Sequence, residues 1–243
     1  MGYEGSDVYN NDVFFERYMK RRHRKESPNA CMEEPVFIEL LGDITGKRIV
    51  DLGCGDAMFG KQLLADGCTS YVGVEGSHKM VEKACHVLQD YLGTVHLSSI
   101  EDYLFPSESY DIVVSRMALH YIEDLRKVFE KIHHTLVDGG SFVFSVMHPI
   151  ITSSFKSYEQ SGRRQDWIVD DYFWSGKRVE VWMEQEVVKY HRTMENYFSL
   201  LQECGFTIEQ LREPMPQKEW FEDIEEYNRR MRIPLMVVFR CRK

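Results

Sequence analysis

The feature that most constrains the fold is a short apolar strand that runs into a glycine-containing turn and then into a helix. Arg48 to Leu52 is rich in β-branched and apolar residues, Gly53 and Gly55 follow it, and Ala57 to Ala65 has helical composition. Gly53 permits a tight turn, and Gly55 lets a ligand approach the backbone because it has no side chain. The helix that follows presents free N–H groups at its start. This segment predicts an α/β sheet with a ligand-binding edge where the strand ends.

The same alternation of strand and helix continues along the chain. Further strands are expected at 71–75, 94–97, 110–115 and 141–147, and further helices at 77–92, which Ser77 caps, and 124–136, which Asp138-Gly139-Gly140 ends. A β-α-β-α order of this kind predicts a doubly wound, mostly parallel sheet with helices on both faces. We expect closing strands at 206–211 and 235–241.

The remaining segments flank or interrupt this core. Two helices, Phe14 to Lys25 and Glu33 to Leu41, are expected to form an N-terminal cap over residues 1–46, ahead of a core over 47–149. The aromatic stretch 150–192, with a short strand at 178–182, is predicted to be an inserted lid, because long excursions between regular elements are usually functional. Thr193 is expected to cap a helix ending near Cys204 within the closing part, 193–243, which also holds a charged helix at about 220–231. The whole chain is interpreted as a single domain.

Composition limits the classes of partner. The 243 residues carry a formal net charge of −9, whereas proteins that grip phosphate backbones usually carry a positive field. The six cysteines have neither C-x-x-C nor zinc-ligand spacing, so we expect no metal site and a reducing compartment. No apolar run approaches membrane-spanning length, and the N-terminus is polar. We therefore expect a cytoplasmic protein, a monomer or homodimer, with no membrane or nucleic-acid partner.

A carboxylate twenty residues after the glycine turn indicates what the edge binds. The second strand ends in Glu75, which can accept both hydroxyls of a ribose. Dinucleotide-binding and S-adenosylmethionine-binding domains share this pair of features. The dinucleotide fingerprint requires a glycine where this chain has Met58, and Asp56 would repel a pyrophosphate. A sulfonium ligand with an α-amino group tolerates those acidic neighbours.

At this point the sequence resembles the class I S-adenosylmethionine-dependent methyltransferases. VDLGCGDA (50–57) resembles their first motif, with Ala57 in place of the last glycine, and GVEGS (73–77) their second. SSIEDYLFP (98–106) resembles the adenine-contacting segment, although Ser99 stands where the family often has Asp. YDIVVSRMALHYIED (110–124) resembles the fourth motif, and the strand after LVDGG the fifth. The resemblance covers about 47–147, and it implies a seven-stranded sheet closed by an antiparallel hairpin.

The resemblance implies S-adenosylmethionine as cofactor, S-adenosylhomocysteine as product, and an O or N atom of a small molecule as acceptor. The implied cofactor residues are Asp51, Gly53, Cys54, Gly55, Glu75, Gly76, Ser77, Met80, Ser99, Ile100, Glu101, Ser115 and Arg116. An N-terminal helix closes over the cofactor in related enzymes, which adds Tyr18 and Arg22, spaced as neighbours on one helix face.

Three histidines are candidate bases or acceptor contacts. His120 follows the fourth strand, His148 ends the fifth, and His191 lies where the lid rejoins the core. Ligands bind at the carboxyl ends of strands in open α/β sheets, which favours the first two. Each is equally readable as a buried histidine bonded to backbone. The lid residues Tyr172, Trp174 and Trp182 either face a planar or cationic acceptor or form the lid's own small core.

Three other functions stay open. The basic run 20–25 fits a nucleic-acid or protein methyltransferase, although Ser115-Arg116-Met117 stand where amino-directed nucleic-acid methyltransferases carry a Pro-Pro-aromatic motif. A non-catalytic S-adenosylmethionine-binding module and a nicotinamide oxidoreductase are the others. Separate titrations with S-adenosylmethionine, its demethylated product and NAD distinguish these functions, because a specific ligand stabilises the fold.

Overall fold

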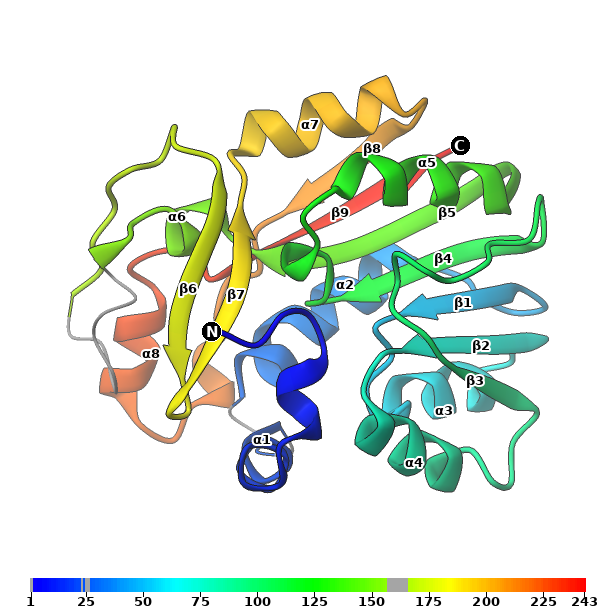
Figure 1. Ribbon diagram of the computed structural model, residues 1–243, viewed down its shortest axis with the longest axis horizontal. Coiled ribbons are helices and arrows are strands. Elements are labelled where there is room, and N and C mark those ends of the chain that lie inside the picture. The colour runs from blue at the N-terminus through cyan, green and yellow to red at the C-terminus, as the bar shows by residue number, and fades with distance from the viewer. Residues whose placement is uncertain (1, 23, 25–26, 157–165) are drawn as a thin grey trace.

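A seven-stranded sheet organises the molecule. The structure is a computed structural model that describes residues 2–22, 24, 27–156 and 166–243. The strand order is β3-β2-β1-β4-β5-β9-β8, and β9 runs antiparallel to the other six strands (Figure 1). The strands are β1 (Arg48–Leu52), β2 (Ser70–Glu75), β3 (Gly93–Leu97), β4 (Tyr110–Arg116), β5 (Leu136–Met147), β8 (Thr207–Arg212) and β9 (Met236–Arg242). The predicted doubly wound, mostly parallel sheet is confirmed.

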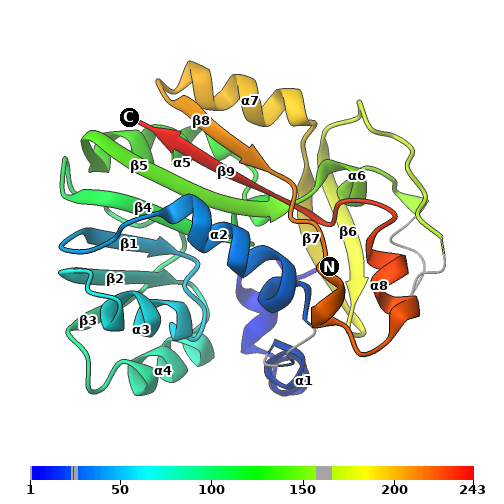
Figure 2. The same ribbon diagram turned by 180° about the vertical axis from the view of Figure 1, so that it is seen from behind.

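Helices cover both faces of this sheet (Figures 1 and 2). One buried cluster joins the sheet to α2 (Glu34–Leu41), α3 (Met58–Ala65) and α4 (His78–Val87). A second joins the opposite face to α5 (Leu125–Thr135) and α7 (Met194–Glu203). Each helix buries one apolar stripe against the sheet, which is how this layered architecture forms its core.

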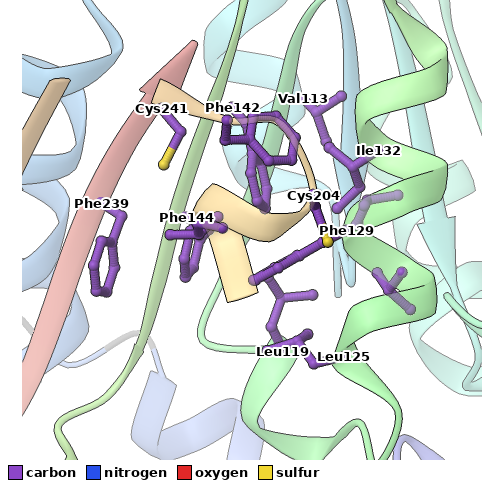
Figure 3. Packing of buried hydrophobic residues seen from close by; sticks show 14 of the residues in the cluster. Val113, Leu119, Leu125, Phe129, Ile132, Phe142, Phe144, Cys204, Phe239 and Cys241 are labelled. Carbon is purple, nitrogen blue, oxygen red and sulfur yellow. The ribbon is translucent and has the colours of Figure 1, made fainter. Parts of the chain in front are cut away.

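Phenylalanines from three elements form the centre of the second cluster (Figure 3). Phe129 of α5 meets Phe142 of β5 edge to face, with ring centroids 5.7 Å apart. Phe144 of β5 stacks on Phe142 at 4.7 Å and on Phe239 of β9 at 4.9 Å. These stacked and edge-to-face pairs tie the antiparallel strand to the parallel part of the sheet.

Several element boundaries differ from the sequence expectation, and two of the differences lie in the core. The helix expected over 77–92 begins after its Ser77 cap as predicted but ends at Val87, because Leu88 packs back into the core before β3 starts. The turn at Asp138-Gly139-Gly140 does not end a helix. Helix α5 has already ended at Thr135, and Leu136 pairs with Tyr110, so this turn lies at an irregularity inside the longer strand β5.

Segments from distant parts of the chain meet beyond the carboxyl ends of the strands. After β5 the chain forms the short α6 (Pro149–Thr152) and the hairpin β6 (Gly176–Trp182) and β7 (Gln185–His191). The N-terminal η1 (Asp7–Asn10) and α1 (Asp12–Arg22) pack beside this hairpin, and α8 (Ile224–Arg230) lies near it (Figure 1). Tyr3 forms a β-bridge with Val187, and Arg17 pairs with Glu184 at 2.8 Å. Among the described residues, no helix combines the length and apolarity needed to cross a membrane.

Replacing Phe129 by alanine should lower the free energy of unfolding by about 3–5 kcal/mol, because it empties a fully buried ring site shared by three elements. Urea unfolding followed by far-UV circular dichroism measures the change. Leu104→Ala is the matched control, since Leu104 is 89% exposed and its removal should change stability by less than about 0.5 kcal/mol. Equal losses for the two variants would contradict this account of the core.

Candidate active site

The glycine turn after β1 and the end of β2 are joined by one carboxylate. Glu75 accepts hydrogen bonds from the backbone N–H of Gly55 at 3.0 Å and of Ser77 at 2.8 Å, one on each carboxylate oxygen. Gly53 and Gly55 both adopt positive φ, 78° and 59°. A Cβ on Gly53 would lie only 2.5 Å from that of Ala118, so the close approach to the loop after β4 requires glycine. The hydrogen bond to Gly55 therefore fixes the glycine turn beside Glu75, and no side chain from Gly53 or Gly55 fills the space above the turn.

Burial sets the electrostatics of the two acidic residues at this edge. The pKa of Glu75 is raised by burial, an effect opposed by the N–H donors of Ser77 and Gly55. Burial also raises the pKa of Asp51 to about 6, against the hydrogen bond that the Tyr71 hydroxyl donates to it at 2.9 Å. Nearby Arg116 and Arg22 lower the Asp51 pKa by smaller amounts.

A cavity of about 280 Å³ opens at this edge of the sheet. Ligand sites for small molecules commonly measure about 300–1,000 Å³, so its size approaches that range. Of the residues implied as cofactor contacts, its wall includes Tyr18, Arg22, Gly53, Gly55, Glu75, Gly76, Met80, Ser99, Ile100, Glu101 and Arg116. These residues come from the turn after β1, the end of β2, α4, the loop after β3, β4 and α1, so the fold brings together segments that are far apart in sequence.

The N-terminal segment forms the outer wall of this cavity. Arg22 donates a hydrogen bond to the Tyr18 hydroxyl at 2.8 Å, and its Nε lies 3.6 Å from a carboxylate oxygen of Asp56. A Cβ on Gly55 would point at the Arg22 guanidinium, 3.7 Å away. The charge of Tyr18 is the main cause that raises the pKa of Arg22. Burial lowers this pKa, and the charge of Asp56 raises it further. A permanent cation therefore faces the glycine turn.

The opposite end of the cavity is built from α4 and the loop after β3. Met80 and Ile100 supply apolar surface, and both are buried. The hydroxyl of Ser99 donates to Asp102 at 2.7 Å and accepts from the Asp102 N–H at 3.0 Å, which forms a closed turn. Position 99 therefore carries a serine where the family often has an aspartate. The carboxylate of Asp102 is hydrogen-bonded to that serine.

Four implied cofactor residues lie behind the wall. Asp51 is engaged with Tyr71, and Ser115 donates to the Leu52 carbonyl at 2.8 Å, which ties β4 to β1. The Cys54 sulfur packs where a Cβ on Gly73 would stand, and burial raises its thiol pKa. Ser77 caps α4 and donates to Asn10 at 2.9 Å. Their contacts shape and support the cavity.

The three candidate histidines lie outside the cavity wall as the described residues define it. Both ring nitrogens of His191 are engaged, with Thr152 at 2.7 Å and the Tyr172 carbonyl at 2.9 Å. In His148, Nδ1 accepts from the Ile150 N–H at 3.2 Å, and Nε2 lies 2.8 Å from Glu213. Burial lowers the pKa of both, opposed by the Tyr172 hydrogen bond in His191 and by Glu213 in His148.

His120 differs from the other two. Its ring packs against Tyr121, a residue of the cavity wall, with centroids 4.4 Å apart. Nδ1 is buried and has no hydrogen-bond partner within the described part of the chain. Burial, followed by the charges of Lys189 and Arg192, lowers the His120 pKa well below its ordinary value. The imidazole is therefore neutral at physiological pH.

Of the three lid aromatics, Trp182 packs on the N-terminal helix, whereas Tyr172 and Trp174 do not. Trp182 packs edge to face on Phe14 and Tyr18 at 5.2 and 5.7 Å, so it reaches the N-terminal wall of the cavity. Trp174 is 73% exposed, and Tyr172 packs on Phe173 and His191. Of the three aromatics singled out from the sequence, Trp182 lies nearest to a residue of the cavity wall.

Several wall residues carried no sequence signal. They are Glu4, Gly5, Ser6, Asp7, Tyr9 and Asn29, whereas Met117, Ala118, Tyr121 and Ile122 lie in the fourth motif but were not singled out as contacts. Residues 4–9 belong to no motif, and their place depends on long-range contacts. A Cβ on Gly76 would lie 2.2 Å from the Ser6 hydroxyl, so the N-terminal segment packs directly over the end of β2. Met117, Ala118 and Tyr121 follow β4 and were findable only as members of the fourth motif.

Comparisons with known proteins agree with this geometry. The family model described as a methyltransferase domain matches residues 50–144. The S-adenosylmethionine-dependent methyltransferase from Mesorhizobium loti, a solved structure, is 31% identical, covers 87% of this chain and 97% of its own, and superposes with a TM-score of 0.79. An uncharacterized protein of Haemophilus influenzae is 31% identical over 97% of this chain and 96% of its own length.

Two relatives that match only part of this chain are named for different reactions, methyl transfer and hydroxylation. A malonyl-[acyl-carrier protein] O-methyltransferase of Hamiltonella defensa is 26% identical over 61% of this chain and 56% of its own. A mitochondrial arginine hydroxylase of Rattus norvegicus is 28% identical over 53% of this chain and 40% of its own. These relatives leave the reacting atom of the acceptor open.

Asp51→Asn should change how stability depends on pH. The folded-state pKa of Asp51, about 6, exceeds the ordinary 3.8, so the unfolded chain ionises first and ionisation destabilises the fold as pH rises through this window. The contribution is about 3 kcal/mol at most, lost between about pH 4 and 6. The variant should therefore gain stability relative to wild type from pH 4.5 to 7.5 in urea unfolding. A difference that does not vary with pH would show that Asp51 is already ionised at the lower pH.

Proposed function

The chain belongs to the S-adenosylmethionine-dependent methyltransferases with the class I fold, and on that premise we propose that it methylates an oxygen or nitrogen atom of a small molecule. The cofactor is S-adenosylmethionine. The observation that carries the proposal is the Glu75 carboxylate in the cavity wall, next to the open glycine turn. Ribose hydroxyls require such an acceptor, and the backbone at Gly53 and Gly55 leaves room for the sulfonium end.

The residues present fit this cofactor along the length of the cavity. Gly55 has no side chain where a Cβ would fill the space before Arg22. Arg22 is a suitable partner for a ligand carboxylate, because guanidinium–carboxylate pairs are among the stronger hydrogen-bonded pairs. Met80 and Ile100 offer apolar surface to the adenine. Ser99 and Glu101 are proposed to contact the polar edge of that ring.

The loop after β4 is proposed to face the transferred methyl group. Arg116 is fixed by two carboxylates, since its Nε lies 3.1 Å from Glu33 and its terminal nitrogen 3.0 Å from Glu34. Glu33 is fully buried and also accepts from the Ser145 hydroxyl at 2.7 Å. A wall held this firmly orients the acceptor and excludes water. Bound cofactor supplies an already activated methyl group, so alignment is the main task left to the protein.

Proton removal from the acceptor, where it is needed, is proposed for His120. Its imidazole is neutral, and it packs on Tyr121 at the cavity wall. His191 is less suited because both of its ring nitrogens are hydrogen-bonded, and His148 because its Nε2 lies 2.8 Å from the Glu213 carboxylate, although that contact lacks hydrogen-bond geometry. The Nδ1 of His120 can accept a proton without first losing a hydrogen bond, and its lowered pKa makes it a weaker base than an ordinary imidazole.

A small acceptor is favoured over nucleic acid by how the basic residues are used. In α1, Arg17 pairs with Glu184 of the hairpin, and Arg22 lies in the cavity wall beside Asp56. These two cations are committed to contacts within the molecule, whereas Lys20, Arg21 and Arg24 are exposed. With a net charge of −9, the chain lacks the positive balance that phosphate-backbone binding usually requires.

Isothermal titration calorimetry with S-adenosylhomocysteine tests the proposal. Wild-type protein should bind it, and Glu75→Gln should weaken binding about 10- to 100-fold, because a hydrogen bond to a charged group contributes about 1.5–3 kcal/mol. Glu82→Gln is the control, since Glu82 is exposed on α4. NADH should give no binding heat.

Two results would argue against the assignment. One is binding of NADH by a wild-type protein that ignores both S-adenosylmethionine and S-adenosylhomocysteine. The other is equal affinity for S-adenosylhomocysteine in wild type and Glu75→Gln, which would remove the ribose contact from the account.

A further inference from the structure

A buried ion pair lies behind the cavity wall, on the hairpin that covers it. The Lys189 ammonium contacts the Glu180 carboxylate, and the two side chains are 5% and 13% exposed. In this antiparallel hairpin, Glu180 pairs in register with Val187, and Arg178 with Lys189. Register partners share a face, so Glu180, Trp182, Val187 and Lys189 all lie on one face of the hairpin. Val187 and Trp182 pack in a cluster with Tyr18 and Tyr121 of the cavity wall, so this face turns toward the cavity.

The Lys189 ammonium lies close to the cavity, with the ring of the wall residue Tyr121 beside it. It lies 5.8 Å from the ring centroid of Tyr121 and 5.4 Å from that of Trp182. Its nitrogen is also 3.3 Å from the sulfur of Met147, at the end of β5. Met147 packs in the same cluster as Met117, which lines the cavity. Among the described residues Lys189 does not line the cavity, and the Tyr121 ring and the two methionines lie between its ammonium and the cavity.

Structural stability alone is a weak reason for this pair. Moving two charges out of water costs about as much as their attraction returns, and apolar replacements are often neutral or stabilising. Lys189 is also surrounded by apolar and aromatic groups that would pack equally well around a methionine. A buried ion pair one aromatic ring away from the cavity is therefore better explained by a functional contact than by stability.

The charges near the pair favour an anionic ligand. Arg21 at the end of α1 has its pKa lowered by burial and by Arg24 and Arg229, while Glu180 raises it. These groups therefore share one electrostatic neighbourhood. Arg229 of α8 lies 5.8 Å from the Trp167 ring and is paired with Glu226. Arg21 therefore adds a second positive charge near Glu180, in a chain whose net charge is −9.

We propose that the acceptor carries an anionic group, a carboxylate or a phosphate, and that Lys189 binds this group beside the rings of Tyr121 and Trp182. Glu180 holds the lysine in place when the acceptor is absent and competes with the ligand anion for it. The apolar part of the acceptor packs on the two rings and on Met117, which positions its reacting atom at the cavity wall. This inference rests on the proposed methyl transfer and adds a substrate class to it.

The test compares the two halves of the ion pair. Protein saturated with S-adenosylhomocysteine is titrated with sodium phosphate and, separately, with sodium benzoate, at constant ionic strength set by sodium chloride, and binding is followed by thermal shift and calorimetry. Lys189→Met should weaken binding of the effective anion by about tenfold or more, because it removes a charge-assisted contact. Glu180→Gln should instead tighten it several-fold, because the competing carboxylate is gone. Whichever probe responds identifies the anion as phosphate or carboxylate.

The exposed pair Arg126 and Glu203 provides the matched control, with side chains 47% and 54% exposed. Arg126→Met should leave anion binding unchanged. A structural role for the buried pair predicts that Lys189→Met and Glu180→Gln lower the melting temperature together and leave anion binding equal, which would overturn the proposal. Stabilisation by tetramethylammonium chloride but by neither anion would overturn it in favour of a cationic acceptor.

The controls separate this proposal from the proposed function. S-adenosylhomocysteine affinity is measured first for each variant, and failure of wild type to bind it would refute the methyltransferase assignment rather than the anion site. If Lys189→Met does not fold, Glu180→Gln and the charge-conserving Lys189→Arg decide the matter, since the proposal requires tighter binding in the first and retained binding in the second.

Discussion

The structure of the ligand edge depends on the buried Glu75 carboxylate, which joins two backbone turns. One oxygen holds the Gly55 N–H and the other the Ser77 N–H. This fixes the glycine turn after β1 relative to the start of α4, and the sheet alone would not set that distance. Burial makes the charged form of Glu75 costly, and the backbone donors offset part of that cost. A ribose would add its hydroxyls to a carboxylate that is already positioned.

The N-terminal segment connects this carboxylate to the acceptor side. Ser6 lies directly over Gly76, and Arg22 lies over Gly55. The same segment bridges to the hairpin through Tyr3 and Val187, and Phe14 and Tyr18 pack on Trp182. The cofactor cavity and the buried Lys189–Glu180 pair therefore share one covering segment. Ordering of that segment by the cofactor would also order the side chains proposed to hold the acceptor.

The sequence predicted the parts of the fold that local pattern controls. The strand at 48–52, the Ser77 and Thr193 caps and the seven-stranded sheet follow from periodicity, capping residues and the family motifs. Local pattern could not predict which motif residues have side chains that do not line the cavity. Asp51 and Ser115 lie in recognisable motifs, yet their side chains bond to Tyr71 and to Leu52, because strand pleating alternates the direction of successive side chains. Cys54 lies in the turn after β1, and its sulfur packs near Gly73.

Long-range contacts placed the rest of the site. Residues 4–9 reach the cavity through packing on Gly76 and Val187, and neither contact leaves a trace in the local sequence. The pairing of Lys189 with Glu180 depends on the register of a hairpin whose second strand the sequence did not delimit. His120 was a candidate from its place after β4, but its neutral state follows from burial and from Lys189 and Arg192, which only the tertiary structure brings near.

Hydrogen–deuterium exchange with and without S-adenosylhomocysteine tests the central claim most directly, because it reports on the glycine turn, the end of β2 and the N-terminal cover in one experiment. Binding should slow amide exchange in 53–57 and 75–77 and, through the covering segment, in 3–22. Protection confined to other parts of the chain, with these three segments unchanged, would contradict the claim that Glu75 and the glycine turn hold the cofactor beneath the N-terminal segment.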